Sequence, residues 1–160
     1  MGKIPLRMLV IALGGCVIGS LVQAQQPPSV SESVTVTIGS RFSPDPVELR
    51  GLSGGTVPAS EVAERRETTN GLCEGFVNEK PNHTLVLTDF FDYLSLQIQS
   101  PEDTTLIIRG PGGSWCNDDY KGKNPGIAGQ WLAGTYQVWI GSHGRTRYHP
   151  YIIRISGKRP

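Results

Sequence analysis

Side chains suited to metal chemistry gather at the end of a predicted β-hairpin that runs from Asp103 to Asp119. Asn117, Asp118 and Asp119 are three consecutive oxygen donors, and Asp103 precedes the first strand of the hairpin. Ca²⁺ binds oxygen ligands, roughly six to eight of them, on irregular loops. These four residues therefore form a candidate calcium site. The alternative is that the Asp and Asn side chains cap turns by bonding nearby backbone groups.

A second candidate for chemistry is Ser53, in the run Gly-Leu-Ser-Gly-Gly from Gly51 to Gly55. A serine nucleophile needs a histidine base, and the chain offers His83, His143 and His149. The motif departs from the chymotrypsin-like Gly-Asp-Ser-Gly-Gly because Leu replaces Asp and because the serine precedes every histidine. The run is therefore interpreted as a glycine-rich turn, with a serine hydrolase as the alternative function. All three histidines are expected at solvated loop positions, and no metal-binding or phosphate-binding motif accompanies them.

The first 24 residues are typical of an export signal. Lys3 and Arg7 precede an apolar run, and Val22-Gln23-Ala24 has the small-residue pattern of a signal-peptidase site. An alternative is lipidation at Cys16, which follows Leu-Gly-Gly. The apolar run is too short for a bilayer span, so we expect no membrane span in the mature protein. The sequence thus predicts a secreted or periplasmic protein, cleaved near Ala24.

Export has consequences for charge and for the cysteines. Removing residues 1–24 takes away two basic residues and no acidic one, which changes the net charge from +1 to about −1. This balance gives no electrostatic support for binding nucleic acid. Cys73 and Cys116 then remain in an oxidising compartment, where a structural disulfide is expected. Closing this loop of about 44 residues would stabilise the fold by roughly 4 kcal/mol in the chain-entropy model.

The elements that must position these groups are short strands. Residues 25–33 have the composition of a disordered lead-in, and residues 34–160 form the predicted domain. Alternating apolar residues and β-branched runs predict strands at 34–38, 47–49, 84–87, 93–100, 104–109, 114–116, 135–140 and 151–155. Residues 58–70 are predicted to be an exposed loop or one or two helical turns. The pattern predicts an all-β fold, an antiparallel β-sandwich or jelly-roll-like single domain.

Three tryptophans, Trp115, Trp131 and Trp139, could stack on sugar rings if they were exposed in a row, although aromatic residues in sandwiches commonly pack in the core. On the predicted strand 135–140, three residues are expected to face inward and Trp139 outward; the inward residues expected on this and two other strands are Tyr136, Val138 and Ile140, then Leu94, Leu96 and Ile98, and Tyr151, Ile153 and Ile155. Trp139 is therefore the tentative ligand-binding residue, on the opposite face.

The chain resembles small secreted bacterial modules related to the pre-peptidase C-terminal domains. The residues that carry the resemblance include Cys73-x-Gly-Phe, Gly110-Pro-x-Gly-x-Trp-Cys-Asn-Asp-Asp and Gly134-Thr-Tyr-x-Val-Trp-x-Gly-Ser. The resemblance runs from about Phe42 to Ile155 and implies a non-catalytic accessory β-sandwich. We expect no peptidase domain beside this module, so the usual role beside an enzyme does not transfer directly.

Together these features predict a non-catalytic, exported binding module. Its expected partner is an extracellular or cell-surface polymer or protein, and no cofactor is expected apart from the candidate calcium ion. The alternatives are a calcium-stabilised structural module, a carbohydrate-binding module, and a hydrolase using Ser53.

Overall fold

The computed structural model describes residues 33–160 of the chain. The predicted signal peptide, the alternative lipidation site Cys16 and nearly all of the predicted lead-in lie outside the described residues. Within residues 33–160, no helix is both long and apolar enough to cross a membrane.

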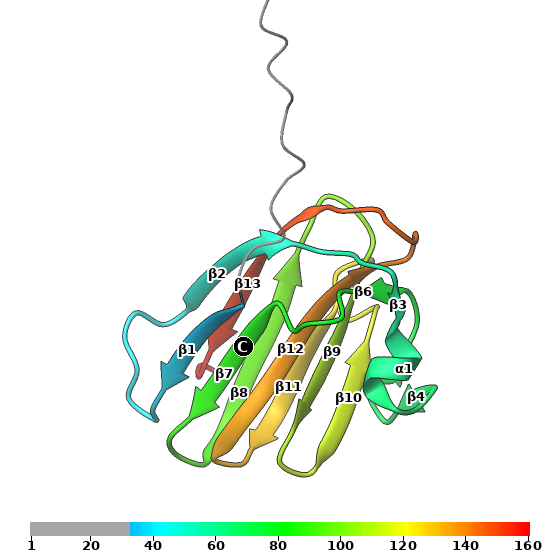
Figure 1. Ribbon diagram of the computed structural model, residues 1–160. Coiled ribbons are helices and arrows are strands. Elements are labelled where there is room, and N and C mark those ends of the chain that lie inside the picture. The colour runs from blue at the N-terminus through cyan, green and yellow to red at the C-terminus, as the bar shows by residue number, and fades with distance from the viewer. Residues whose placement is uncertain (1–32) are drawn as a thin grey trace, which may run out of the picture.

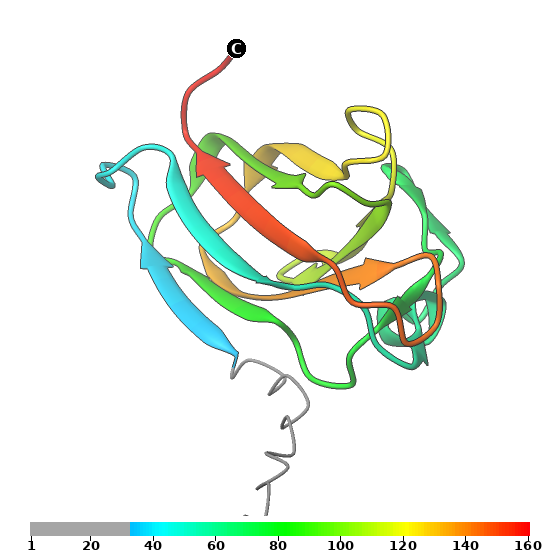
Figure 2. The ribbon, with the colours of Figure 1, turned by 90° about the horizontal axis from the view of Figure 1, so that it is seen from above.

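The protein is a β-sandwich of two sheets, seen from the front in Figure 1 and from above in Figure 2. The larger sheet, called the large sheet, has the order β1-β7-β12-β9-β10. Beyond the end of β7, β6 pairs with the same side of β12, and β3 pairs with β6. All of its pairs are antiparallel except β1 with β7. Its strands are β1 (Val34–Ile38), β3 (Val57–Pro58), β6 (Phe76–Val77), β7 (His83–Leu87), β9 (Thr104–Gly110), β10 (Gly113–Asn117) and β12 (Gly134–Ser142).

The second sheet, called the small sheet, is antiparallel throughout and has the order β11-β8-β13-β2. Its strands are β2 (Val47–Leu52), β8 (Phe91–Gln99), β11 (Gly126–Trp131) and β13 (Pro150–Ser156). A short hairpin of β4 (Glu67–Thr68) and β5 (Gly71–Leu72), together with one turn of helix α1 (Ala59–Ala63), lies beside β10. The predicted antiparallel β-sandwich is confirmed.

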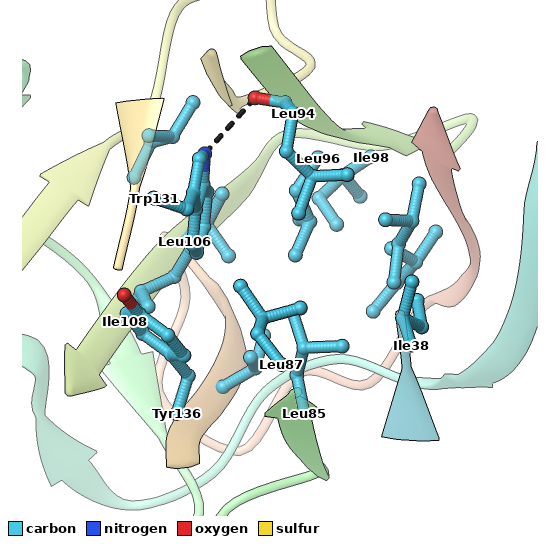
Figure 3. Close-up of a cluster of buried hydrophobic side chains, with 14 of the residues drawn as sticks. Ile38, Leu85, Leu87, Leu94, Leu96, Ile98, Leu106, Ile108, Trp131 and Tyr136 are labelled. Atoms are coloured by element: carbon cyan, nitrogen blue, oxygen red, sulfur yellow. Dashed lines mark hydrogen bonds between the residues drawn. The ribbon is translucent and has the colours of Figure 1, made fainter. Parts of the chain in front are cut away.

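The main core lies between the two sheets, and alternation along the strands builds it. On β8, Leu94, Leu96 and Ile98 are at most 2% exposed, and the same spacing buries Tyr136, Val138 and Ile140 on β12 and Tyr151, Ile153 and Ile155 on β13. Figure 3 shows side chains of both sheets meeting in this core. The inward faces predicted for these three strands are therefore confirmed. On the edge strand β1, Val34, Val36 and Ile38 become progressively more buried along the strand, from 45% exposed at Val34 to 1% at Ile38.

A second apolar cluster lies on the outer face of the large sheet. Its buried members are Ala59, Ala63, Cys73, Val77, Ile107, Cys116 and Trp139. Helix α1 and the segment after it cover this part of the face, and the disulfide between Cys73 and Cys116 ties that cover to β10. The predicted disulfide is confirmed. The helical turn in residues 58–70 is also confirmed, but it contributes two buried alanines to a core that its sequence pattern did not indicate.

Candidate binding site

An open slot lies where the two sheets leave their edges unpaired. Among the described residues 33–160, β10 pairs only with β9 in the large sheet, and β11 pairs only with β8 in the small sheet. These two edge strands are neighbours in space. The slot between them has a volume of about 290 Å³ and is lined by residues from the β9–β10 turn, from β10 and β11, and from the start of β12.

Three aromatic rings line the slot, one from each of β10, β11 and β12. The ring of Tyr136 lies centrally, with ring centroids 5.1 Å from Trp131 and 6.3 Å from Trp115. Trp131 and Tyr136 are almost fully buried, whereas Trp115 is half-buried and faces the slot. The exposed part of the aromatic surface is therefore supplied mainly by Trp115, backed by two rings that the core holds in place.

Hydrogen bonds fix the two buried rings. Trp131 Nε1 donates to the carbonyl of Leu94 at 2.9 Å, the bond drawn in Figure 3, and the Tyr136 hydroxyl donates to the carbonyl of Leu132 at 2.9 Å. Burial raises the pKa of the Tyr136 phenol, so the hydroxyl remains a donor at neutral pH. Since both rings are anchored by packing and by a polar bond, the slot is largely preformed.

Local backbone features explain why the slot stays open. The turn Pro111-Gly112 joins β9 to β10, and Gly112 has φ +94°, the positive value that the second central residue of a type II turn requires. A Cβ on Gly110 would stand 2.2 Å from a ring atom of Tyr136. Only glycine at this position lets the ring pack against the strand, so Gly110 is a requirement of the site.

The slot is uncharged. Besides the three rings, it is lined by Asn70, Pro111, Gly112 and the run from Ile127 to Leu132, none of which carries a charge. Leu132 is 53% exposed at the rim, and Gln130 is exposed, with its amide Nε2 donating to Asp92 Oδ1 at 3.1 Å. An apolar floor with a few amide groups suits a neutral ligand that has one apolar face and several hydrogen-bonding groups.

No model of a known protein family matches the chain. The chain is 26% identical over 141 residues to an uncharacterised protein of Synechococcus elongatus, an alignment that covers 86% of this chain and 92% of that protein.

Two solved structures are similar to the chain. One is the pre-peptidase C-terminal domain of a Bacillus anthracis collagenase, with a TM-score of 0.46 and 7% identity over 79% of this chain and 98% of that one. The other is Aeromonas hydrophila PliG, a periplasmic inhibitor of g-type lysozyme, with a TM-score of 0.41 and 12% identity over 78% of this chain and 98% of that one. Both are small β-sandwich modules.

Asn117, one of the candidate calcium ligands, has structural partners at both ends of its side chain. Its Oδ1 accepts a hydrogen bond from the backbone N–H of Gly126 at 2.9 Å, and its Nδ2 donates to the carbonyl of Asn70 at 2.7 Å. It therefore joins the end of β10 to the edge of β11. Thr68 lies at the edge of β10, where its hydroxyl accepts a hydrogen bond from the N–H of Cys116 and donates one to the carbonyl of Cys116. These two side chains satisfy edge groups on either side of the slot.

Two of the other candidate ligands, Asp103 and Asp118, interact with His143. His143 Nε2 is 3.6 Å from Asp103 Oδ1. Partial burial raises the pKa of Asp118, the carboxylates of Asp119 and Glu74 raise it further, and the interaction with His143 opposes this shift. Within residues 33–160, no three His, Cys, Asp or Glu side chains are grouped so that they could hold a metal ion. Calcium binding by Asp103, Asn117, Asp118 and Asp119 stays a prediction.

Ser53 is completely buried, which removes the geometric basis for the hydrolase alternative. Its Oγ lies 2.9 Å from Ser142 Oγ and accepts a hydrogen bond from the backbone N–H of His149 at 3.2 Å. A nucleophile must reach its substrate and have an imidazole within hydrogen-bond distance. Ser53 instead ties β2 to β12 and to the start of β13.

His83 was predicted to be a solvated loop residue, but it is a core residue that is 2% exposed. Its Nε2 shares a hydrogen bond of 2.7 Å with the Tyr151 hydroxyl, and the two rings meet edge to face. Burial lowers the pKa of His83 from 6.5 to about 4. The prediction was wrong because His83 begins β7 on the inward face, in register with Val138 on β12. His143 is exposed and His149 half-buried, as loop positions allow.

Trp139 does face away from the main core, but it is only 4% exposed. The expectation of an exposed platform is therefore wrong, because helix α1 and the disulfide-linked segment cover this part of the sheet. The structure instead brings Trp115 and Trp131 together in the slot. The sequence predicted that Tyr136 lies in the core. Its ring also lies between the two tryptophans, and this contact depends on β10 and β11 becoming adjacent edges.

Proposed function

We propose that this protein is a non-catalytic binding protein that acts outside the cytoplasm and holds its ligand in the aromatic slot. The observation that carries the proposal is the set of three rings, Trp115, Tyr136 and Trp131, lining an uncharged opening between two strand edges. Fixed aromatic surface contributes binding energy at little conformational cost. The disulfide supports an oxidising compartment.

The ligand class that the slot favours is a neutral saccharide. A sugar ring has an apolar face that can lie against Trp115 and hydroxyls that can bond the side-chain amide of Asn70 at the rim. A charged ligand would leave its charge without a partner in this lining. The burial of the Ser53 hydroxyl supports the non-catalytic part of the proposal.

Titration with a panel of neutral oligosaccharides, followed by calorimetry, tests the proposal. We expect at least one member to bind and the substitution Trp115→Ala to weaken that binding about tenfold or more. The matched control is Phe90→Ala, which removes another exposed aromatic ring that does not line the slot. Unchanged affinity in Trp115→Ala, or equal losses in both variants, would rule out the slot as the binding site.

A further inference from the structure

A second open surface lies on the outer face of the large sheet, beside the segment that covers Trp139. It is a groove of about 570 Å³ whose lining is mainly polar. Its floor comes from the outward-facing side chains of β7, β9, β10 and β12, and its wall comes from the end of α1. The polar and charged side chains of its lining include Thr84, Arg109, Ser114, Gln137, Glu64 and Arg65.

The strand register places five hydrogen-bonding side chains in one row across this face. Each is the register partner of the next, from β1 at one edge to β10 at the other: Thr35, Thr84, Gln137, Arg109 and Ser114. Neighbouring strands are about 4.8 Å apart, so the row is about 19 Å long with one polar group at each strand. Such a row matches a linear ligand that presents polar groups at short, regular intervals.

The charge of the groove selects among such ligands. Arg109 is held in place, because its Nη1 donates to the carbonyl of Val62 at 3.1 Å and its Nη2 to Glu64 Oε1 at 2.8 Å. Arg65 adds a second guanidinium to the lining, so two positive charges stand against the single carboxylate of Glu64. The groove therefore carries a net positive charge, which a ligand bearing carboxylates complements.

We propose that this groove binds an acidic linear polysaccharide, whose chain crosses the strands along the row and whose carboxylates face Arg65 and Arg109. The site is separate from the slot, since Ser114 and Trp115 are consecutive on β10 and their side chains point to opposite faces of the sheet. A neutral saccharide in the slot and an acidic chain on the outer face would use different residues.

The test is calorimetry of the full-length protein with oligogalacturonate and with a neutral cello-oligomer of the same length. We expect the acidic oligomer to bind at least tenfold more tightly and its affinity to fall as salt rises. Arg65→Ala is expected to weaken binding about tenfold, and Gln137→Ala several-fold. Glu64→Gln keeps an acceptor for Arg109 and removes the opposing charge, so it is expected to tighten binding about two- to threefold.

Matched controls stand on the outer face of the small sheet and in the slot. Arg50→Ala and Gln99→Ala remove the same residue types from strands β2 and β8, and Trp115→Ala disrupts the slot. All three are expected to leave binding of oligogalacturonate unchanged. Three results would each overturn the inference: neither oligomer binds, both bind equally, or the small-sheet controls weaken binding as much as Arg65→Ala. Equal binding of poly-glutamate would also overturn it, because the partner would then be an acidic peptide chain.

Discussion

Acidification is expected to destabilise the folded protein through His83. The unfolded chain takes up a proton on this imidazole near pH 6.5, but the folded protein does so only near pH 4, because burial disfavours the charged form. Between these two values the unfolded state binds more protons, so the stability that neutral His83 confers is fully present above pH 6.5 and is lost as the pH falls toward 4. The interval corresponds to about 3 kcal/mol, at roughly 1.4 kcal/mol per pH unit.

Urea unfolding at about pH 7 and about pH 4 measures this loss, and substitution of His83 isolates it from the carboxylates that titrate over the same range. The wild type is expected to lose about 3 kcal/mol more than His83→Gln across this interval. His149→Gln is the control, since His149 bonds Ser53 through its backbone N–H and its backbone carbonyl, which this substitution keeps. If wild type and His83→Gln lose the same free energy, the reasoning about burial is refuted. An NMR titration that gives His83 a pKa near 6.5 would refute it independently.

Three other predictions follow from buried bonds and from the candidate metal site. Ser53→Ala is expected to lower the free energy of unfolding by about 1 to 3 kcal/mol, because Ser142 and the His149 N–H lose a buried partner, and to leave oligosaccharide binding unchanged. Urea unfolding measures the first effect and calorimetry the second. An unchanged free energy of unfolding would contradict the structural role of Ser53. Replacing both Cys73 and Cys116 by Ser is expected to cost roughly 4 kcal/mol in the same unfolding assay, and a loss near zero would show that the disulfide does not hold the cover on the sheet. For the calcium hypothesis, EDTA is expected to lower the melting temperature by several degrees, and identical melts with EDTA and with added Ca²⁺ would eliminate it.

Much of the fold could be predicted because burial on one face leaves a period-two pattern in the sequence. β8, β12 and β13 show it plainly, and their inward residues are the ones predicted. The sequence did not predict β11, because Gly126-Ile-Ala-Gly-Gln-Trp has two glycines and only two large apolar residues, Ile127 and Trp131, which do not form a run of alternating positions. The segment becomes a strand through its pairing with β8.

The candidate site was less accessible to sequence reasoning, because it depends on which elements become neighbours. The outward position of Trp139 was read correctly from alternation, but its cover comes from residues 59–73, which carry no strong apolar stripe. The aromatic slot likewise requires β10 and β11, strands of different sheets, to end as adjacent edges. A period-two pattern specifies a face and not the element that packs on it, so neither feature follows from one segment alone.

The most direct test of the proposed binding function is a two-dimensional NMR titration of the protein with the tightest-binding neutral oligosaccharide of the panel. The account predicts that the largest shift changes fall on the Trp115 indole N–H and on the backbone N–H groups of Gly112 and of residues 127–132, which line the slot. Shift changes that cluster on another surface, or no shift changes with any member of the panel, would contradict it.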